Sequence, residues 1–247
     1  QTTTFIITQR TGACQRIALA ANDYARQTLL PSLLAGSQFS TVGISHLTTS
    51  HRHLAKPVLT AVETETGFIL NGFCPWVTGA TQAETVVIGA TLEDSRQILT
   101  VMPTSLSGVT LHDPASLVAL TSSHTGRVSM DNVTVDRKWL LGGPIENVMV
   151  GGIGARTGGL QTSTLALGLA GAAIEFIVEE SQRRDDLQGP AQSLLTEWEG
   201  LRGELLDTAA GIAACAAEDL RMRANDLVLR ATQASLSAAK GAGFVTG

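Results

Sequence analysis

The sequence predicts an α+β multidomain fold in which helices come first, a β-rich middle follows and a helical bundle comes last. Apolar residues recur at helical spacing up to about residue 38 and again from about residue 155. Short segments rich in Thr, Val, Ile and Ser fill the stretch from 40 to about 145. Closely spaced strands without intervening helices are typical of a sandwich or barrel rather than a parallel α/β sheet.

The first zone is predicted to be helical. Apolar residues continue at helical spacing through residues 5–19, and Asn22 can cap a second helix with a leucine stripe over 29–34. Gly36 is a typical residue to end that helix. Pro31 either kinks it or begins a new turn.

The middle zone predicts a series of short strands. The segment 85–91 reads TVVIGAT and is expected to be mostly buried. Asn71 and Gly72 tolerate positive φ, so this pair predicts a tight hairpin at the end of its strand. The predicted strands cover 58–62, 67–72, 85–91, 98–102, 108–111, 117–120 and 126–135.

The last zone predicts three long helices. The first begins near residue 160 and breaks at 183–190. The second is expected from about 191 to 222 and the third from about 225 to 239. The alanines between 209 and 217 favour a helix and allow close packing.

Composition excludes several classes of protein. The 247 residues are 44% apolar and 4% aromatic with a net charge of −5, which argues against disorder and against a nucleic-acid binder. The apolar stretch 165–178 contains Glu175 and falls short of the roughly 20 residues of a membrane span. Three cysteines with no Cys-x-x-Cys spacing do not form a disulfide framework, so a cytoplasmic location is expected.

Three motifs that suggest other chemistry are weak. The glycines of 152–159 lack the preceding strand and following βαβ unit of a dinucleotide loop, and a connection before a helix is the simpler interpretation. His51 and His53 have no fixed third ligand, so no metal site is predicted. No G-x-S-x-G elbow is present.

The segment 71–79, NGFCPWVTG, is the most informative. Trp76 and Thr78 are two residues apart, so on one strand they share a face. A ring that packs and a hydroxyl that hydrogen-bonds together suit a planar conjugated ligand. A buried Trp with an incidental Thr is the alternative.

Five segments in order resemble motifs of the acyl-CoA dehydrogenase family of flavoproteins, and they span nearly the whole chain. Residues 70–79 resemble its lNGxKxWITNG strand. Residues 128–142 resemble FxxVxVPxxxxLG, and 165–173 resemble the long helix that follows. Residues 21–46 match the order of GND, helix and short strand (41–46) before TEPGAGSD, and 241–244 resemble the GGNGY turn.

The resemblance implies a remnant of a helical N-terminal domain (1–39), a central antiparallel β-barrel (40–147) and a C-terminal four-helix bundle (148–247). It implies a homodimer or homotetramer, with FAD between the β domain and the C-terminal helices. Arg184 takes the place of the family's phosphate-binding Arg. The other residues to which it gives a cofactor contact are Ile44, Ser45, His46, Trp76, Val77, Thr78, Ser237, Lys240 and Gly241.

The sequence departs from the family at several positions. The Gly-rich turn of TEPGAGSD is missing, and Arg52 replaces a Ser that meets the acyl-CoA. Arg52 is therefore a candidate for a CoA phosphate or another anion, with a solvated loop as the alternative. The RxxFG motif is weakened to RDDLQ at 184–188.

The catalytic residue stays unassigned. The family's Glu follows the GGNGY turn, beyond Gly247, or begins the first bundle helix, where this sequence has Gly158. Because the sequence opens with Gln1 rather than Met and stops before the position of the family's Glu, we expect the chain to be incomplete at both ends.

The resemblance implies an FAD-dependent oxidoreductase of fatty acid metabolism that dehydrogenates an acyl-CoA thioester. A base removes the α-proton while a hydride goes to flavin N5, held by Thr78 and flanked by Trp76. An electron-transfer flavoprotein is a possible acceptor, and neither nucleic acid nor membrane is expected as a partner. The alternatives are a flavin-dependent monooxygenase on the same fold and a non-catalytic subunit of a heteromeric dehydrogenase.

Overall fold

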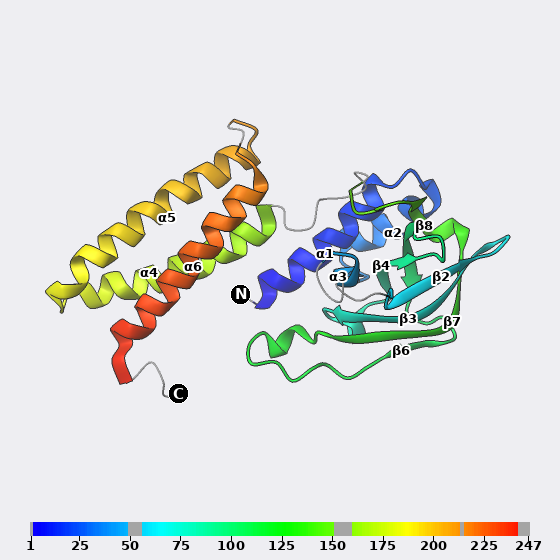
Figure 1. Ribbon diagram of the computed structural model, residues 1–247, viewed down its shortest axis with the longest axis horizontal. Coiled ribbons are helices and arrows are strands. Elements are labelled where there is room, and N and C mark those ends of the chain that lie inside the picture. Colours follow the sequence, from blue (N-terminus) through cyan, green and yellow to red (C-terminus); the bar gives the residue numbers. More distant parts are fainter. Residues whose placement is uncertain (1, 49–55, 151–159, 213–214, 242–247) are drawn as a thin grey trace. The chain divides into compact units, whose positions relative to one another are not determined.

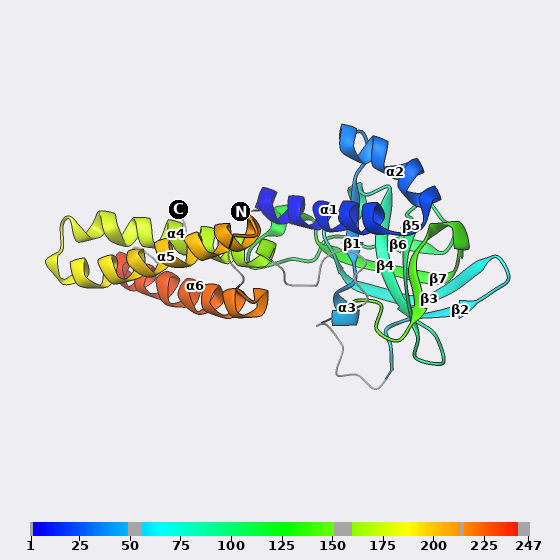
Figure 2. The same cartoon turned by 90° about the horizontal axis from the view of Figure 1, so that it is seen from above.

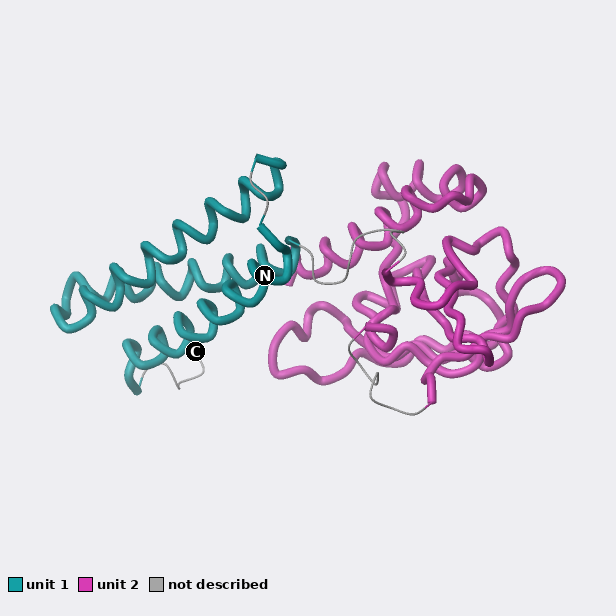
Figure 3. Tube along the Cα trace, turned by 45° about the horizontal axis from the view of Figure 1, so that its top comes forward, with its two compact units in different colours: residues 1, 158–247 teal, residues 2–157 magenta. Residues whose placement is uncertain are grey.

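The computed structural model describes residues 2–48, 56–150, 160–212 and 215–241 (Figures 1 and 2). It divides into two compact units, residues 2–157 and residues 158–247, which Figure 3 shows in magenta and teal. Helices, a sheet and further helices follow one another along the chain. The predicted α+β multidomain fold is confirmed.

Two helices precede the sheet, α1 (Thr2–Leu19) and α2 (Asp23–Ala35). The side chain of Asn22 accepts hydrogen bonds from the backbone N–H groups of Tyr24 and Ala25, which would otherwise lack partners at the start of α2. Gly36, at φ 73°, ends the helix in the left-handed conformation. Both ends lie where the sequence predicts them, and α2 continues through Pro31.

The sheet has eight strands in the order β6-β7-β3-β2-β4-β5-β8, with β1 added beside β4. Most neighbours are antiparallel, but β1 and β2 each pair with β4 in parallel, so the sheet is mixed rather than wholly antiparallel as predicted. The strands are β1 (Ser40–Gly43), β2 (Leu59–Glu63), β3 (Gly67–Val77), β4 (Thr85–Thr91), β5 (Gln97–Pro103), β6 (Val109–Leu111), β7 (Gly126–Asp136) and β8 (Leu140–Ile145).

Strand β4 is buried on both faces and separates two apolar cores. Val86 and Ile88 pack with side chains of β2, β3, β5 and β7, whereas Val87 packs on the other side with α1 and α2. A strand covered on both faces has a continuous apolar sequence, which confirms the prediction for TVVIGAT. The helices and the sheet share a core, and the predicted three-domain division stays a prediction.

The predicted hairpin at Asn71 and Gly72 is wrong, because β3 runs through both residues. Gly72, at φ 126°, lies where the register with β7 shifts, and a Cβ there would lie 2.1 Å from the carbonyl oxygen of Val58. Gly72 therefore serves a close strand approach. The turn between β2 and β3 comes earlier, where the N–H of Thr64 donates to the carbonyl of Gly67.

Two other predicted strands are corrected. Residues 117–120 form no strand, since Val118 is fully exposed and Leu120, at φ 62°, leads into a 3-10 turn (Thr121–Ser123). The strand predicted over 41–46 ends at Gly43, and a single helical turn, α3 (Ser45–Thr48), follows.

The second unit contains α4 (Leu160–Ser181), α5 (Gln188–Ala209) and α6 (Ala217–Ala239), packed around a leucine and alanine core. Helix α5 ends at Ala209 and α6 begins at Ala217, so the break comes earlier than the predicted one at 223–224. Gly211, at φ 73°, turns the chain inside the alanine-rich stretch. The described residues of this unit form three long helices, whereas the resemblance implied a bundle of four.

Helix α4 begins near residue 160 and ends before 183, as the sequence predicts, but it is longer than the apolar stretch 165–178 considered there for a membrane span. Its 22 residues, with a mean hydropathy of 1.4 in the most apolar window, could cross a membrane by length and composition alone. Leu167, Ile174 and Ile177 instead pack into the core with α5 and α6, as in the core helix of a bundle. This single helix is weak support for a membrane span.

Candidate functional site

The indole of Trp76 is exposed at the end of β3. Its neighbours Pro75 and Val77 are buried, whereas Trp76 is 47% exposed. The pairing with β7 shifts between Cys74 and Val77, so Pro75 and Trp76 together lie opposite Arg127. Such a bulge changes the direction of a side chain and leaves a large flat ring on the surface, where a planar ligand can pack.

The end of β1 lies against the same part of β3. The thiol of Cys74 donates to the carbonyl oxygen of Gly43 at 3.2 Å, and burial raises the pKa of this thiol. A Cβ on Gly43 would lie 3.0 Å from the side chain of Val77 and 3.1 Å from the sulfur of Cys74. Only glycine lets β1 and β3 approach this closely without displacing a neighbour.

The residues that follow β1, namely Ile44 and the helical turn α3, differ in how they are held. Ring nitrogen Nε2 of His46 donates to the carbonyl oxygen of Gly89 in β4 at 2.8 Å, so the imidazole is fixed to the sheet. The hydroxyl oxygen of Ser45 is buried and has no hydrogen-bond partner among the residues described. An unsatisfied buried hydroxyl is costly, so this oxygen is suited to a polar ligand atom. Ile44 packs into the core beneath the helices.

Thr78 follows the end of β3 and is buried. Its hydroxyl lies 3.0 Å from that of Thr125, which lies 2.8 Å from that of Ser123. Gly79, at φ 65°, turns the chain, and its N–H donates to the carbonyls of Ser123 and His124. Trp76 and Thr78 therefore do not share an exposed face, because the strand ends between them. The side chain of Val77 is also buried, in the sheet core.

The other predicted cofactor residues belong to the helical unit and gather at the end of α6. Arg184 donates to the carbonyl oxygen of Ala238 at 3.0 Å and to the carboxylate of Asp186 at 2.9 Å. The hydrogen bond from Arg184, with a smaller contribution from Lys240, lowers the pKa of Asp186. Ser237 donates to Gln233 within α6, and Lys240 and Gly241 are exposed just beyond it. The structure thus brings Arg184 to the segment 237–241.

No family model matches the chain. It is 23% identical over 192 residues to a probable acyl-CoA dehydrogenase, YngJ, of Bacillus subtilis, a match that covers 76% of this chain and 49% of that protein. Among solved structures, glutaryl-CoA dehydrogenase in complex with glutaryl-CoA superposes with a TM-score of 0.84 at 19% identity, covering 98% of this chain and 67% of that one. An FAD-dependent dehydrogenase gives 0.83 at 17% identity, with coverage of 99% and 71%.

The chain is therefore similar in sequence and in fold to acyl-CoA dehydrogenases. It spans about half the length of the curated relative named above. The likeness to these two solved structures, both below 25% identity, shows the fold.

Several candidates for acyl-CoA dehydrogenase chemistry fall outside the described residues. These include Arg52 with its flanking His51 and His53, and Gly158 at one position of the family base. The turn that resembles GGNGY is described only at Gly241. Within the described part of the chain, no three His, Cys, Asp or Glu side chains gather as they would around a metal ion.

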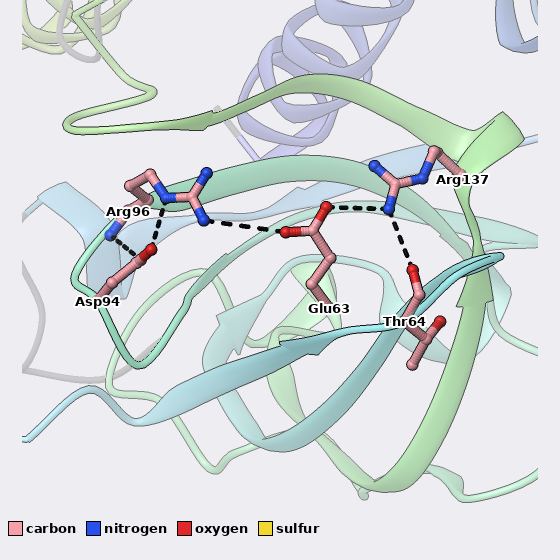
Figure 4. Close-up of polar contacts among 5 residues, drawn as sticks. All are labelled: Glu63, Thr64, Asp94, Arg96 and Arg137. Carbon is pink, nitrogen blue, oxygen red and sulfur yellow. Dashed lines mark hydrogen bonds and ion pairs between the residues drawn. The ribbon is translucent and has the colours of Figure 1, made fainter.

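A shallow cavity of about 480 Å³ lies elsewhere on the first unit. Arg137, on its wall, donates to the carboxylate of Glu63 and to the carbonyl oxygen of Thr64 (Figure 4). Glu63 also faces Arg96 at 3.9 Å, and Arg96 pairs with Asp94. These exposed ion pairs connect the end of β2, the end of β7 and the turn before β5. The cavity is lined by Ala21, Asn22, Arg137, Leu140, Leu141, Gly142 and Gly143, none of which the sequence assigns to a cofactor.

A polar group next to Trp76 is not among the site residues that the sequence predicts. Arg127 lies over the ring of Phe73, with Ser129 and His112 beside it. The signal available was the alternation along the predicted strand 126–135, which places 127 and 129 on one face. Phe73 lies beside these two residues because β3 pairs with β7, and the local sequence does not reveal that pairing.

Proposed function

We propose that this chain binds FAD and belongs to an acyl-CoA dehydrogenase-like oxidoreductase. The enzyme dehydrogenates the acyl group of an acyl-CoA thioester. The single observation that supports it most is the exposed indole of Trp76, beside the end of β1, on a chain related to acyl-CoA dehydrogenases. When bound, FAD supplies a ring that accepts a hydride.

The residues of the first unit fit a flavin in different ways. Trp76 offers its ring, and Ser45 offers a buried hydroxyl that lacks a partner among the described residues. Ile44, His46 and Val77 are engaged within the protein, so any contact from them falls to their backbone groups. The hydroxyl of Thr78 already bonds Thr125 and still has hydrogen-bonding capacity for a ligand atom.

The second unit, considered by itself, offers positive charge for a phosphate group of FAD. The guanidinium of Arg184 is anchored at the end of α6 and Lys240 is exposed beside it. Asp186 neutralises part of that charge. We therefore propose that the phosphate and adenosine part of FAD contacts Arg184, Ser237, Lys240 and Gly241.

The experiment that tests this proposal has two steps. The purified chain is first titrated with FAD, and binding is followed by flavin absorbance and fluorescence. Acyl-CoA thioesters are then added without oxygen, and bleaching of the bound flavin reports dehydrogenation. Binding with bleaching is expected. Binding without bleaching, together with oxygen consumption when reduced flavin is supplied, would move the assignment to the monooxygenase.

A chain that binds no flavin in any titration would contradict the proposal. Flavin binding that requires a second, different subunit would point instead to a supporting role in a heteromeric dehydrogenase.

We also propose a homo-oligomer, an electron-transfer flavoprotein as electron acceptor and a cytoplasmic location. Support for the first comes from α6, where Met222, Leu229 and Leu236 recur every seven residues and are exposed. Light scattering of the purified chain tests the oligomer. A mass of one chain at all concentrations would contradict it.

A further inference from the structure

A second polar site lies beside Trp76, on the outer face of β3, β7 and β6. Ser129 of β7 pairs with Phe73 of β3 on one side and with Thr110 of β6 on the other. Arg127 lies two residues before Ser129. Both face outward, because Val128 between them is buried in the sheet core.

Two contacts hold Arg127 in one orientation. Its guanidinium carbon lies 3.8 Å from the centre of the Phe73 ring, and its Nε donates to the hydroxyl of Ser129 at 3.1 Å. The same hydroxyl lies 2.8 Å from Nε2 of His112, so His112 positions Ser129. Stacking over a ring and a hydrogen bond to Nε together restrict the long side chain before any ligand arrives.

The charge of Arg127 is not neutralised within the described part of the chain. Seven other arginines there form ion pairs with carboxylates, and Arg127 does not. Its two terminal amino groups bond to none of the described residues. A pre-oriented guanidinium with free donors favours a bidentate anion such as a phosphate. The seven paired arginines are Arg26, Arg96, Arg137, Arg183, Arg184, Arg223 and Arg230.

We infer that Arg127 binds a phosphate group of a ligand whose planar part packs on Trp76. The bulge that exposes Trp76 places it opposite Arg127, so one ligand can reach both. This inference rests on the proposed function in its choice of ligand. Flavin adenine dinucleotide and coenzyme A thioesters both carry a pyrophosphate, and the test separates the two sources.

The test compares Arg127→Gln with a matched control, Arg202→Gln. Arg202 also stacks on an aromatic ring, that of Trp198 at 5.5 Å, but it lies in the other unit. Each variant of the whole chain is titrated with FAD, riboflavin and coenzyme A. Arg127→Gln is expected to weaken binding of a phosphate-bearing ligand at least tenfold and to leave riboflavin binding unchanged. Whether FAD or coenzyme A is affected identifies the source.

A third variant, Phe73→Leu, keeps the charge and removes the ring that orients it. It is expected to weaken the same ligand by a smaller factor than Arg127→Gln. Circular dichroism of each variant checks that the fold is kept.

The inference is overturned if Arg127→Gln leaves both FAD and coenzyme A binding unchanged, if FAD and riboflavin weaken equally, or if the unaltered chain binds neither phosphate-bearing ligand. If the chain binds no flavin but coenzyme A binding depends on Arg127, the proposed flavoprotein function fails while the phosphate site stands.

Discussion

The thiol of Cys74 donates a hydrogen bond to the carbonyl oxygen of Gly43, joining two strands whose residues are 31 positions apart. This contact brings the end of β1, and with it Ser45, to the part of β3 that presents Trp76. The candidate site of the first unit therefore depends on a close approach of two strands, and that approach depends on a residue without a side chain.

Replacing this glycine tests the approach. Gly43→Ala places a Cβ 3.0 to 3.2 Å from side-chain atoms of Val77 and Cys74, and we expect it to destabilise the first unit by about 1–3 kcal/mol, as overpacked cores do. Urea unfolding measures the loss. Gly168→Ala, with open space around its Cβ in α4, is the control and should stabilise its own unit by up to about 1 kcal/mol. Equal stability of Gly43→Ala and the unaltered chain would show that the strands are not tightly packed there.

The buried hydroxyl chain gives a second prediction. Thr78→Val keeps the shape of the side chain but leaves the hydroxyl of Thr125 with one partner fewer. We expect a loss of about 1–3 kcal/mol in the free energy of unfolding, since a buried polar group loses its partner. Thr78→Ser, which keeps the hydroxyl, should retain more of this stability. A valine variant as stable as the serine variant would contradict the described network.

The helical unit gives a prediction about pH. Hydrogen bonds from Arg223, at 2.7 Å to each carboxylate oxygen, lower the pKa of Glu204 in the folded chain. A lowered folded pKa stabilises the fold above the unfolded value of about 4.3, and this stability is lost as pH falls through the folded pKa. Because the pair is half-exposed, we expect Glu204→Gln to cost about 0.2–1 kcal/mol at pH 7.

The difference between Glu204→Gln and the unaltered chain should shrink as the pH falls below about 4. Thermal unfolding at a series of pH values measures it. A difference that grows toward low pH would reverse the sign and contradict the assignment.

Local chemistry explains what the sequence could predict. Asn22 begins α2 and Gly36 ends it by contacts with nearby backbone, and the TVVIGAT strand is recognised by its own apolar residues. Asn71 and Gly72 mislead, because their preference for a tight turn is overridden by pairing with the neighbouring strands. The break at Gly211 is missed since the surrounding alanines favour helix.

In the candidate site, too, some features follow from local sequence and others from strand pairing. The sequence shows the residue types around Trp76. It also shows that they resemble a motif of the acyl-CoA dehydrogenases. The exposure of Trp76 follows from a shift in register between β3 and β7, and the stacking of Arg127 on Phe73 follows from the same pairing. Such relationships depend on which strands become neighbours, and local patterns do not specify that.

The most direct test of the central claim is a titration of the whole chain with FAD, comparing Trp76→Ala with the unaltered protein. The control is Val118→Ala, at a fully exposed position of the same unit. We predict that the unaltered chain and the control bind FAD alike and that Trp76→Ala binds at least tenfold more weakly, because loss of base–aromatic-type stacking costs about 1–3 kcal/mol. Equal affinity of all three for FAD, or no binding by any of them, would contradict the claim.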